Sequence, residues 1–412
     1  MKITILEIQK IFRSPIIIIL LLVSIGFNAF IILSNTYWSD ELKVLNQLVD
    51  KYGLTFNDST LQELEEDIFE GIQSIDKEAD SAEAFFNQLT YEAYEVYDAG
   101  TNEKIDELSI LFMYYNLAKE LDARYRELDI QQIGEGVVQT YGVSGVFEKF
   151  VLHEYEKLKV RFNEMLEQEE YKTWFFAGNP YRMHTNLFGE VLKMIAVEGT
   201  ILIVMISAFI ACYEKDHRTN LVTYSTKTGR RLMMKKWQAS LFGTFLIGIL
   251  LMLPTLAIYF SVFDYHGLWQ SRISSGLNWE YNLPYVTWWD ISFIHYLVLA
   301  ILITFSAWLL ISMISFGVSV FIQNSYIATI IVYLLLVAMF VVPSVLSFSP
   351  LLLLLGHFNL TLLLFNPHMY FNGFAGLTVS EYHEVITLLL WLVISGVLMF
   401  ISMKRFLRKD LD

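Results

Sequence analysis

Residues 16–33 read IIIILLLVSIGFNAFIIL, an apolar run of 18 residues without a charged side chain. An α-helix rises about 1.5 Å per residue, so about 20 apolar residues cross the ~30 Å hydrocarbon layer of a bilayer. The run is therefore predicted to be a membrane-spanning helix. No A-x-A-like cleavage site follows it, only Ser34-Asn35-Thr36-Tyr37, which favours an uncleaved anchor over a signal peptide.

Further segments of the same character follow in a chain that is 55% apolar and 17% charged. Soluble proteins usually carry about 25% charged residues. The sequence therefore predicts an all-α membrane protein with six transmembrane helices. The stretch Pro350–Phe365 is also apolar, but Gly356, His357 and Asn359 interrupt it, so a partial or re-entrant hairpin is expected there. The six predicted spans are Ile16–Leu33, Met194–Cys212, Trp237–Phe263, Ile294–Phe321, Tyr326–Leu346 and Val385–Met403.

The positions of lysine and arginine predict the orientation of these spans, because connectors on the cytoplasmic side are rich in both. Outside residues 35–188 the chain has 16 basic residues, and 14 of them fall in three groups that six spans place on one side. That side is predicted to be the cytoplasm, with both termini inside. The 14 residues are Lys2, Lys10, Arg13, Lys215, Arg218, Lys227, Arg230, Arg231, Lys235, Lys236, Lys404, Arg405, Arg408 and Lys409.

Residues 35–188 are then predicted to form an extracellular helical domain inserted between the first two spans. This block holds 31 acidic and 13 basic residues, which argues against nucleic acid as a partner. Its surface is interpreted either as ordinary solvated charge or as a lid that faces a substrate or partner. Apolar residues recur there at helical spacing, as at Leu61, Leu64, Ile68, Ile72 and Ile75, and breaks between helices are expected at Gly100, Gly134, Gly136, Gly142 and Gly145.

The connector between the second and third spans carries the most specific signal. It begins Tyr213-Glu214-Lys215-Asp216-His217-Arg218-Thr219 and continues Tyr224-Ser225-Thr226-Lys227-Thr228-Gly229-Arg230-Arg231, with Lys235-Lys236 before the third span. This pattern resembles the ABC-2 type permeases of ABC transporters. There, span two ends in an acid followed by a small residue and Thr, and a Ser-Thr-Pro-like turn with basic residues leads into span three. Arg218 replaces the usual Gly, and Lys227-Thr228 replaces a common Thr-Pro.

Two other segments share the resemblance. Residues Leu6–Pro15 are similar to the family's cytoplasmic elbow helix, which here would span residues 1–15 and use Glu7, Lys10 and Arg13. The short turn Phe321–Tyr326 also fits. The resemblance implies a first span over 16–34 and a core over 189–412, with a coupling loop at 213–236. Coupling to an ATPase subunit would then rest on Glu214, Arg218, Thr219, Arg230 and Arg231.

The partners follow from the same resemblance. They are a cytoplasmic ABC ATPase subunit, a second permease chain in a homodimer or heterodimer, and the lipids of a bacterial plasma membrane. The chain has no G-x-x-x-x-G-K-[ST] motif, so ATP and Mg²⁺ would be bound by the partner, and no cofactor or enzyme activity is expected in this chain. A plainer interpretation of the loop is basic charge that fixes topology and nothing more.

Few residues are candidates for a chemical site. Glu198 lies inside the second span, where an acid either lines a substrate path or makes a structural hydrogen bond. His153 has no second His four residues on, so no metal site is expected there. The predicted function is export of an amphipathic peptide, a lipid-linked molecule or a drug. The alternatives are a non-transporting receptor or immunity protein, whose outer domain binds a toxin or signal, and a secondary transporter.

Overall fold

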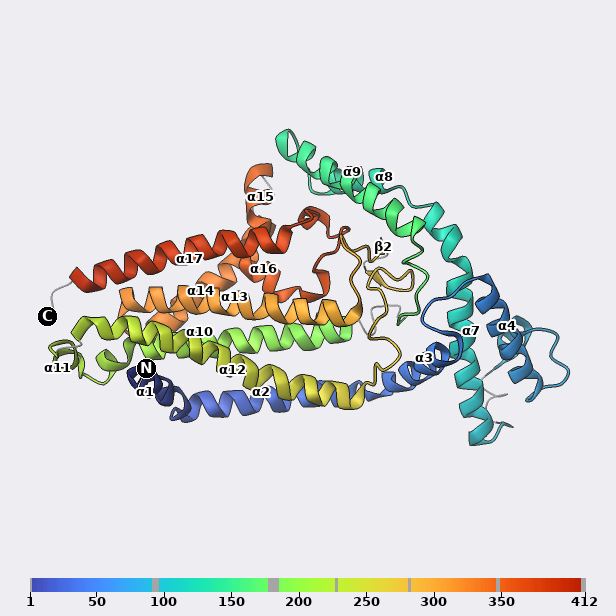
Figure 1. Cartoon of the computed structure of the whole chain (residues 1–412), viewed down its shortest axis with the longest axis horizontal. Coiled ribbons are helices and arrows are strands. Elements are labelled where there is room, and N and C mark those ends of the chain that lie inside the picture. The colour runs from blue at the N-terminus through green and yellow to red at the C-terminus, as the bar shows by residue number, and fades with distance from the viewer. Residues whose placement is uncertain are drawn as a thin grey trace.

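The computed structural model describes residues 2–90, 96–176, 185–226, 229–280, 283–345 and 349–408 and is mostly helical. Long helices lie side by side in a bundle, and a second group of helices gathers beyond one end of it (Figure 1). Both chain termini lie at the opposite end of the bundle. We call the end with the termini the near end and the other the far end.

Among the described residues, five helices are long and apolar enough to cross a membrane. The sixth predicted span corresponds to α14, Ser325–Val345, whose apolar stretch Ser325–Val341 is shorter, and its expected last residue, Leu346, lies outside the described residues. The chain therefore has the character of a multi-pass membrane protein. The five helices are α2 (Pro15–Ser34), α10 (Leu192–Asp216, after a π-helical turn at Thr185–Val191), α12 (Leu232–Val262, after the 3-10 turn η3 at Gly229–Arg231), α13 (Phe293–Ile322) and α17 (His383–Arg408).

The outer helices of the bundle expose large apolar side chains. In α2, Leu22 is 62% exposed and Phe30 is 68% exposed, while α17 leaves Val393 and Phe400 exposed at 64% and 67%. Soluble monomers rarely expose contiguous apolar surface on this scale. Lipid, or another apolar chain, is the environment in which such faces are stable.

The bundle interior is closed by small residues that let helices approach. Trp308 of α13 packs between Gly199 of α10 and Gly248 of α12, and a Cβ at Gly199 would lie 2.2 Å from the indole ring. The indole nitrogen of Trp308 donates to the carbonyl of Ala196 at 3.2 Å. Membrane helices use small residues at their interfaces in this way.

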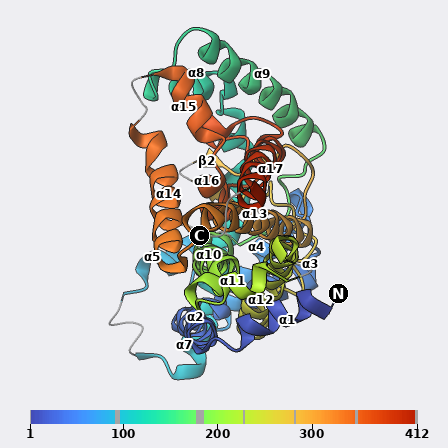
Figure 2. The same ribbon diagram turned by 90° about the vertical axis from the view of Figure 1, so that its left-hand side faces the viewer.

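A serine cluster ties the same three helices together. The hydroxyls of Ser207, Ser240 and Ser312, from α10, α12 and α13, lie 2.9–3.0 Å from one another and are fully buried. Each hydroxyl therefore satisfies its neighbours where water is absent. In the end-on view from the near end, α10 lies among the other bundle helices (Figure 2).

The far-end layer contains most of the predicted outer domain. Its longest helix is α7, and α8 and α9 form a hairpin beyond one end of it (Figure 1). In α4 the apolar residues Leu64, Ile68 and Ile72 are buried, which confirms the predicted face. The helices are η1 (Thr36–Trp38), α3 (Ser39–Tyr52), α4 (Asp58–Gln73), α5 (Ala82–Gln88), α7 (Ala99–Arg126), α8 (Ile130–Thr140) and α9 (Val146–Glu167).

Loop 264–292, between α12 and α13, contacts this layer at a buried ion pair. Arg161 of α9 donates to both carboxylate oxygens of Glu170, at 2.8 and 2.6 Å, and also to the carbonyl of Thr287 at 3.1 Å. The loop contains the short antiparallel strands β1 (Trp279–Glu280) and β2 (Leu283–Pro284). Arg161 thus helps to tie the outer helices to the end of the bundle, together with contacts such as the hydrogen bond from Ser275 to the carbonyl of Thr173.

The glycine pattern was only partly predictive. Gly142 and Gly145 lie in the turn between α8 and α9 with φ of 60° and 71°, so the breaks expected there are confirmed. Gly134 and Gly136 lie inside α8, and Gly100 lies in the first turn of α7, so breaks at these three positions were wrong. Gly134 has a packing role, since a Cβ there would lie 2.6 Å from Cγ of Tyr155.

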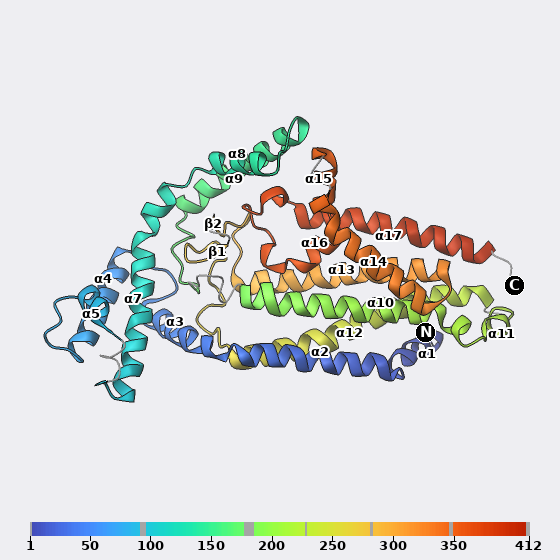
Figure 3. The same cartoon turned by 180° about the vertical axis from the view of Figure 1, so that it is seen from behind.

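The apolar stretch Pro350–Phe365 divides into α15 (Pro350–His357) and α16 (Leu360–Phe365), beside α14 (Figure 3). Asn359 forms the break. Its side chain accepts from the backbone N–H of Thr361 and donates to the carbonyl of Met339 in α14. The interruption is confirmed, and its place in a membrane stays a prediction. The turns η5 (Pro367–Met369) and η6 (Gly376–Thr378) then lead to α17.

Candidate functional site

Four charged residues from three separate helices meet at the near end of the bundle. Lys10 of α1 (Lys2–Phe12) lies 2.7 Å from Glu7 and 3.1 Å from Glu214 at the end of α10. Lys236 of α12 lies 3.1 Å from the other oxygen of Glu7 and 2.6 Å from the other oxygen of Glu214. Each carboxylate is therefore held between two ammonium groups. We call these four residues the near-end charge cluster.

The cluster is mostly buried, and its positive and negative charges balance. Lys236 is fully buried, and the Glu7 and Glu214 side chains are 6% and 5% exposed. The ammonium of Lys236 also donates to the carbonyl of Ile210 at 2.7 Å. The contact between Lys236 and Glu214 is an ion pair rather than an aligned hydrogen bond. Two acids and two bases leave no net charge, which is the condition under which buried ions are tolerated.

The local sequence explains how α1 reaches this position. Glu7 and Lys10 are three residues apart and so share one face of the helix. Ile11 extends the same face and is fully buried against α12, where a Cβ on Gly243 would lie 2.4 Å from its Cδ1. Gly243 thus makes the space that α1 occupies. The opposite side of α1 exposes Ile5 and Leu6, as expected for a helix at a lipid interface.

Tyr213 completes the surroundings of the two lysines. The ammonium of Lys10 lies 4.1 Å from the centre of its ring, and that of Lys236 lies 5.6 Å away. Burial disfavours the charged form of Lys10, but its hydrogen bonds and charge interactions with Glu7 and Glu214 outweigh this and raise the pKa of Lys10. Lys10 is therefore held as a cation that joins α1 to α10.

The predicted coupling loop is compact and partly helical. Helix α10 ends at Asp216, Arg218 turns the chain with a φ of 58°, and the backbone N–H of Thr219 donates to the carbonyl of Glu214 at 2.8 Å. Helix α11 (Asn220–Tyr224) follows. Arg230 donates to the carbonyl of Leu407, near the end of α17, at 2.5 Å. Residues 227–228 lie outside the described residues.

The remaining predicted coupling residues do not join the cluster. Arg218, Thr219 and Arg231 are exposed at the near end, as is Arg13 of the predicted elbow helix. Beside them, α11 exposes two apolar side chains, Leu221 at 55% and Val222 at 74%. These two residues were not predicted from the sequence, because the connector was interpreted from its charged and turn-forming residues. Lys236 was also assigned to the loop, although α12 begins four residues earlier and buries it.

Glu198 lies apart from this cluster, in α10. Its carboxylate accepts a hydrogen bond of 2.7 Å from the side chain of Asn28 in α2, and it is half-buried. The structural hydrogen bond expected of an acid in a span is therefore present. Asn28 was not singled out in the sequence, although it is the one amide within an otherwise apolar run.

The arrangement is suited to mechanical connection rather than to covalent chemistry. Within the described residues no group of three or more His, Cys, Asp or Glu side chains is placed to hold a metal ion. Comparison of the chain with protein-family models, characterised proteins and solved structures finds no match. Its resemblance to ABC-2 type permeases thus stays a prediction, supported by its own residues alone.

Proposed function

We propose that the chain is the membrane-spanning permease subunit of an ABC transporter, with six spans, cytoplasmic termini and an extracellular helical layer. ATP would be hydrolysed by a separate subunit at the near end. A homodimer or heterodimer of permease chains would form the pathway for an amphipathic substrate. The observation that carries this proposal is the near-end charge cluster, which joins α1, α10 and α12 into one unit.

The physical reason is that a buried ion cluster transmits displacement. If a partner moves α1 or the connector, Lys236 and Glu214 cannot separate without leaving a charge unpaired in a buried site, which costs about 3–5 kcal/mol. Moving the connector therefore moves α10 and α12 together. Arg230 extends the same connection to the end of α17 through the carbonyl of Leu407.

A docking surface for the partner lies at the tip of the connector. Leu221 and Val222 are exposed beside Arg218 and Arg231. An apolar centre rimmed by charge is the usual anatomy of a protein interface. The exposed apolar pair is not explained by basic residues that only fix topology, so it favours the coupling interpretation of the loop.

The test is reconstitution with the candidate ATPase. Val222→Asp and Arg218→Glu are expected to abolish co-purification and ATP-dependent transport in proteoliposomes, because both side chains are exposed at the tip of the connector. Lys404→Glu is the matched control, since Lys404 is an exposed base at the same end but outside the connector. Undiminished ATPase binding by both loop variants, or substrate movement without nucleotide, would overturn the proposal.

One observation favours the receptor alternative. A cavity of about 610 Å³ lies between α4, α5 and α7, with Phe69, Phe112 and Tyr115 in its wall and Glu65, Glu66 and Glu83 around it. Such a groove suits a cationic peptide with apolar side chains. Binding of such a peptide to the reconstituted chain without ATP-dependent movement would favour a receptor over a transporter.

A further inference from the structure

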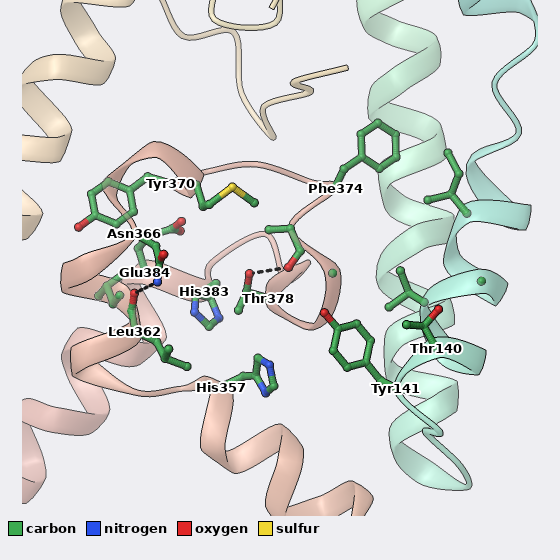
Figure 4. Close-up of a pocket in the computed structure, with 17 residues that line it drawn as sticks. Thr140, Tyr141, His357, Leu362, Asn366, Tyr370, Phe374, Thr378, His383 and Glu384 are labelled. Atoms are coloured by element: carbon green, nitrogen blue, oxygen red, sulfur yellow. Dashed lines mark hydrogen bonds between the residues drawn. The ribbon is translucent and has the colours of Figure 1, made fainter. Parts of the chain in front are cut away.

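A second cavity, of about 540 Å³, lies at the far end, where the outer helices meet the bundle. One wall is α8, with Val137, Thr140 and Tyr141 at its end. The other is built from α15, α16, the turns after α16 and the start of α17 (Figure 4). The walls come from segments more than 200 residues apart, so the cavity exists only where the two layers meet.

His383, in the wall of the cavity, is buried and has a ring nitrogen without a hydrogen-bond partner among the described residues. It is 6% exposed, and the unpaired nitrogen is Nδ1. Its ring packs 5.0 Å from that of Phe358. Buried polar atoms are nearly always hydrogen-bonded to protein or to water, so an unpaired one in the wall of a cavity marks a position that water or a bound molecule completes.

The second histidine in the wall presents an acceptor. Nδ1 of His357 lies 2.7 Å from the carbonyl oxygen of Leu353. A carbonyl can only accept, so Nδ1 carries the proton, and in the neutral ring Nε2 is left as an acceptor. A ligand that donates hydrogen bonds therefore fits this wall better than one that only accepts them.

The carboxyl group in the wall favours a basic ligand. Glu384 lines the cavity and is 5% exposed, with one oxygen accepting from the backbone N–H of Phe371 at 2.7 Å. Among the described residues that line the cavity there is no lysine or arginine. A carboxylate in the first turn of α17 also complements the helix dipole, but this does not account for the unpaired His383. An anionic ligand would meet Glu384 without a counter-charge.

We propose that this cavity binds an amphipathic amine. Its ammonium group lies beside Glu384 and donates to His383 and His357, and its apolar body packs against Val137, Met369 and Phe374. The inference goes beyond the proposed function, because it requires neither transport nor an ATPase. It assigns to the junction of the two layers a site for a cationic amphiphile.

Gly136 offers a way to block the cavity without disturbing the fold. It lines the cavity from α8, and a Cβ added there would meet no atom within 4 Å. Gly136→Leu therefore fills ligand space while replacing glycine by a better helix former. Gly396→Leu is the matched control, because Gly396 is also helical, also has open space at its Cβ and does not line the cavity.

The experiment is equilibrium dialysis of radiolabelled octylamine against the full chain in phosphatidylcholine nanodiscs, with empty nanodiscs subtracted. We expect saturable binding of one amine per chain. Gly136→Leu, which occupies ligand space, and Glu384→Gln, which removes one strong interaction, should each weaken it by about tenfold or more. His383→Phe should weaken it less, and Gly396→Leu should leave it unchanged.

Competitors define the chemistry of the site. Octanoate, which has the same chain and the opposite charge, should not displace octylamine, and octanol should displace it only weakly. Displacement by phosphatidylethanolamine in the nanodisc would identify an amine-bearing lipid as the occupant. Binding that does not saturate, that octanoate displaces equally, or that Gly136→Leu leaves intact would overturn the proposal.

Discussion

The near-end charge cluster and the far-end cavity both bury ionisable side chains, with opposite outcomes. At the near end, Glu7 and Glu214 each have two lysines within about 3 Å, and the group has no net charge. At the far end, Nδ1 of His383 is unpaired beside open space. A satisfied cluster therefore holds helices together, whereas an unsatisfied one is suited to a ligand.

The largest effect is expected where the satisfied cluster is broken. Lys236→Met leaves Glu7 and Glu214 buried with only Lys10 between them, and should lower the free energy of unfolding by about 3–5 kcal/mol. Unfolding by SDS titration in mixed micelles measures this. Lys235→Met is the control. Lys235 is half-buried and, among the described residues, its ammonium bonds to Gln238 on the same helix, so a change within about 0.5 kcal/mol is expected.

A companion variant separates charge balance from packing. Glu214→Gln added to Lys236→Met leaves one acid with one base, so part of the lost stability should return. If Lys236→Met unfolds like the native chain, the cluster does not join α1 to the bundle. The proposed coupling would then lose its physical basis.

The spans were predictable because their signal is local. The first run, Ile16–Leu33, became α2 at Pro15–Ser34, and Ile294–Phe321 became α13 at Phe293–Ile322. Hydrophobic length alone decides such helices. Their partners were not predictable. Lys236 was read as a loop base, since its counter-charge Glu7 lies 229 residues away.

The cavity was missed for the same reason. Its walls unite α8 with the start of α17, and no local pattern relates Gly136 to His383. Glycine is also ambiguous in sequence. It ends a helix where φ is positive, as at Gly142, and it marks close packing where another element approaches, as at Gly134. Only the neighbour in space distinguishes the two.

A smaller effect is expected inside the bundle, where the contact is apolar. Gly199→Ala places a methyl group 2.2 Å from the ring of Trp308, which Gly248 confines on its other side. Overpacking of this kind costs about 1–3 kcal/mol. The same SDS titration measures it, with Gly396→Ala as the control in open space. Equal stability of the two variants would mean that Trp308 does not wedge α10 against α13.

The smallest effects, of opposite sign, are expected from two glycines of α8, the helix that forms one wall of the cavity. Gly134→Ala forces a methyl group to 2.6 Å from Cγ of Tyr155, near the root of that side chain, so α8 and α9 must shift apart. Gly136→Ala meets nothing within 4 Å and gains helix propensity, worth up to about 1 kcal/mol. Hydrogen exchange of the α8 amides should therefore quicken in the first variant and slow in the second.

Because the two positions share a helix, a difference in sign isolates what each side of α8 faces: Tyr155 on one side and the open cavity on the other. Slower exchange in both variants would mean that α8 does not pack closely on α9, and faster exchange in both would mean that the cavity is filled by protein.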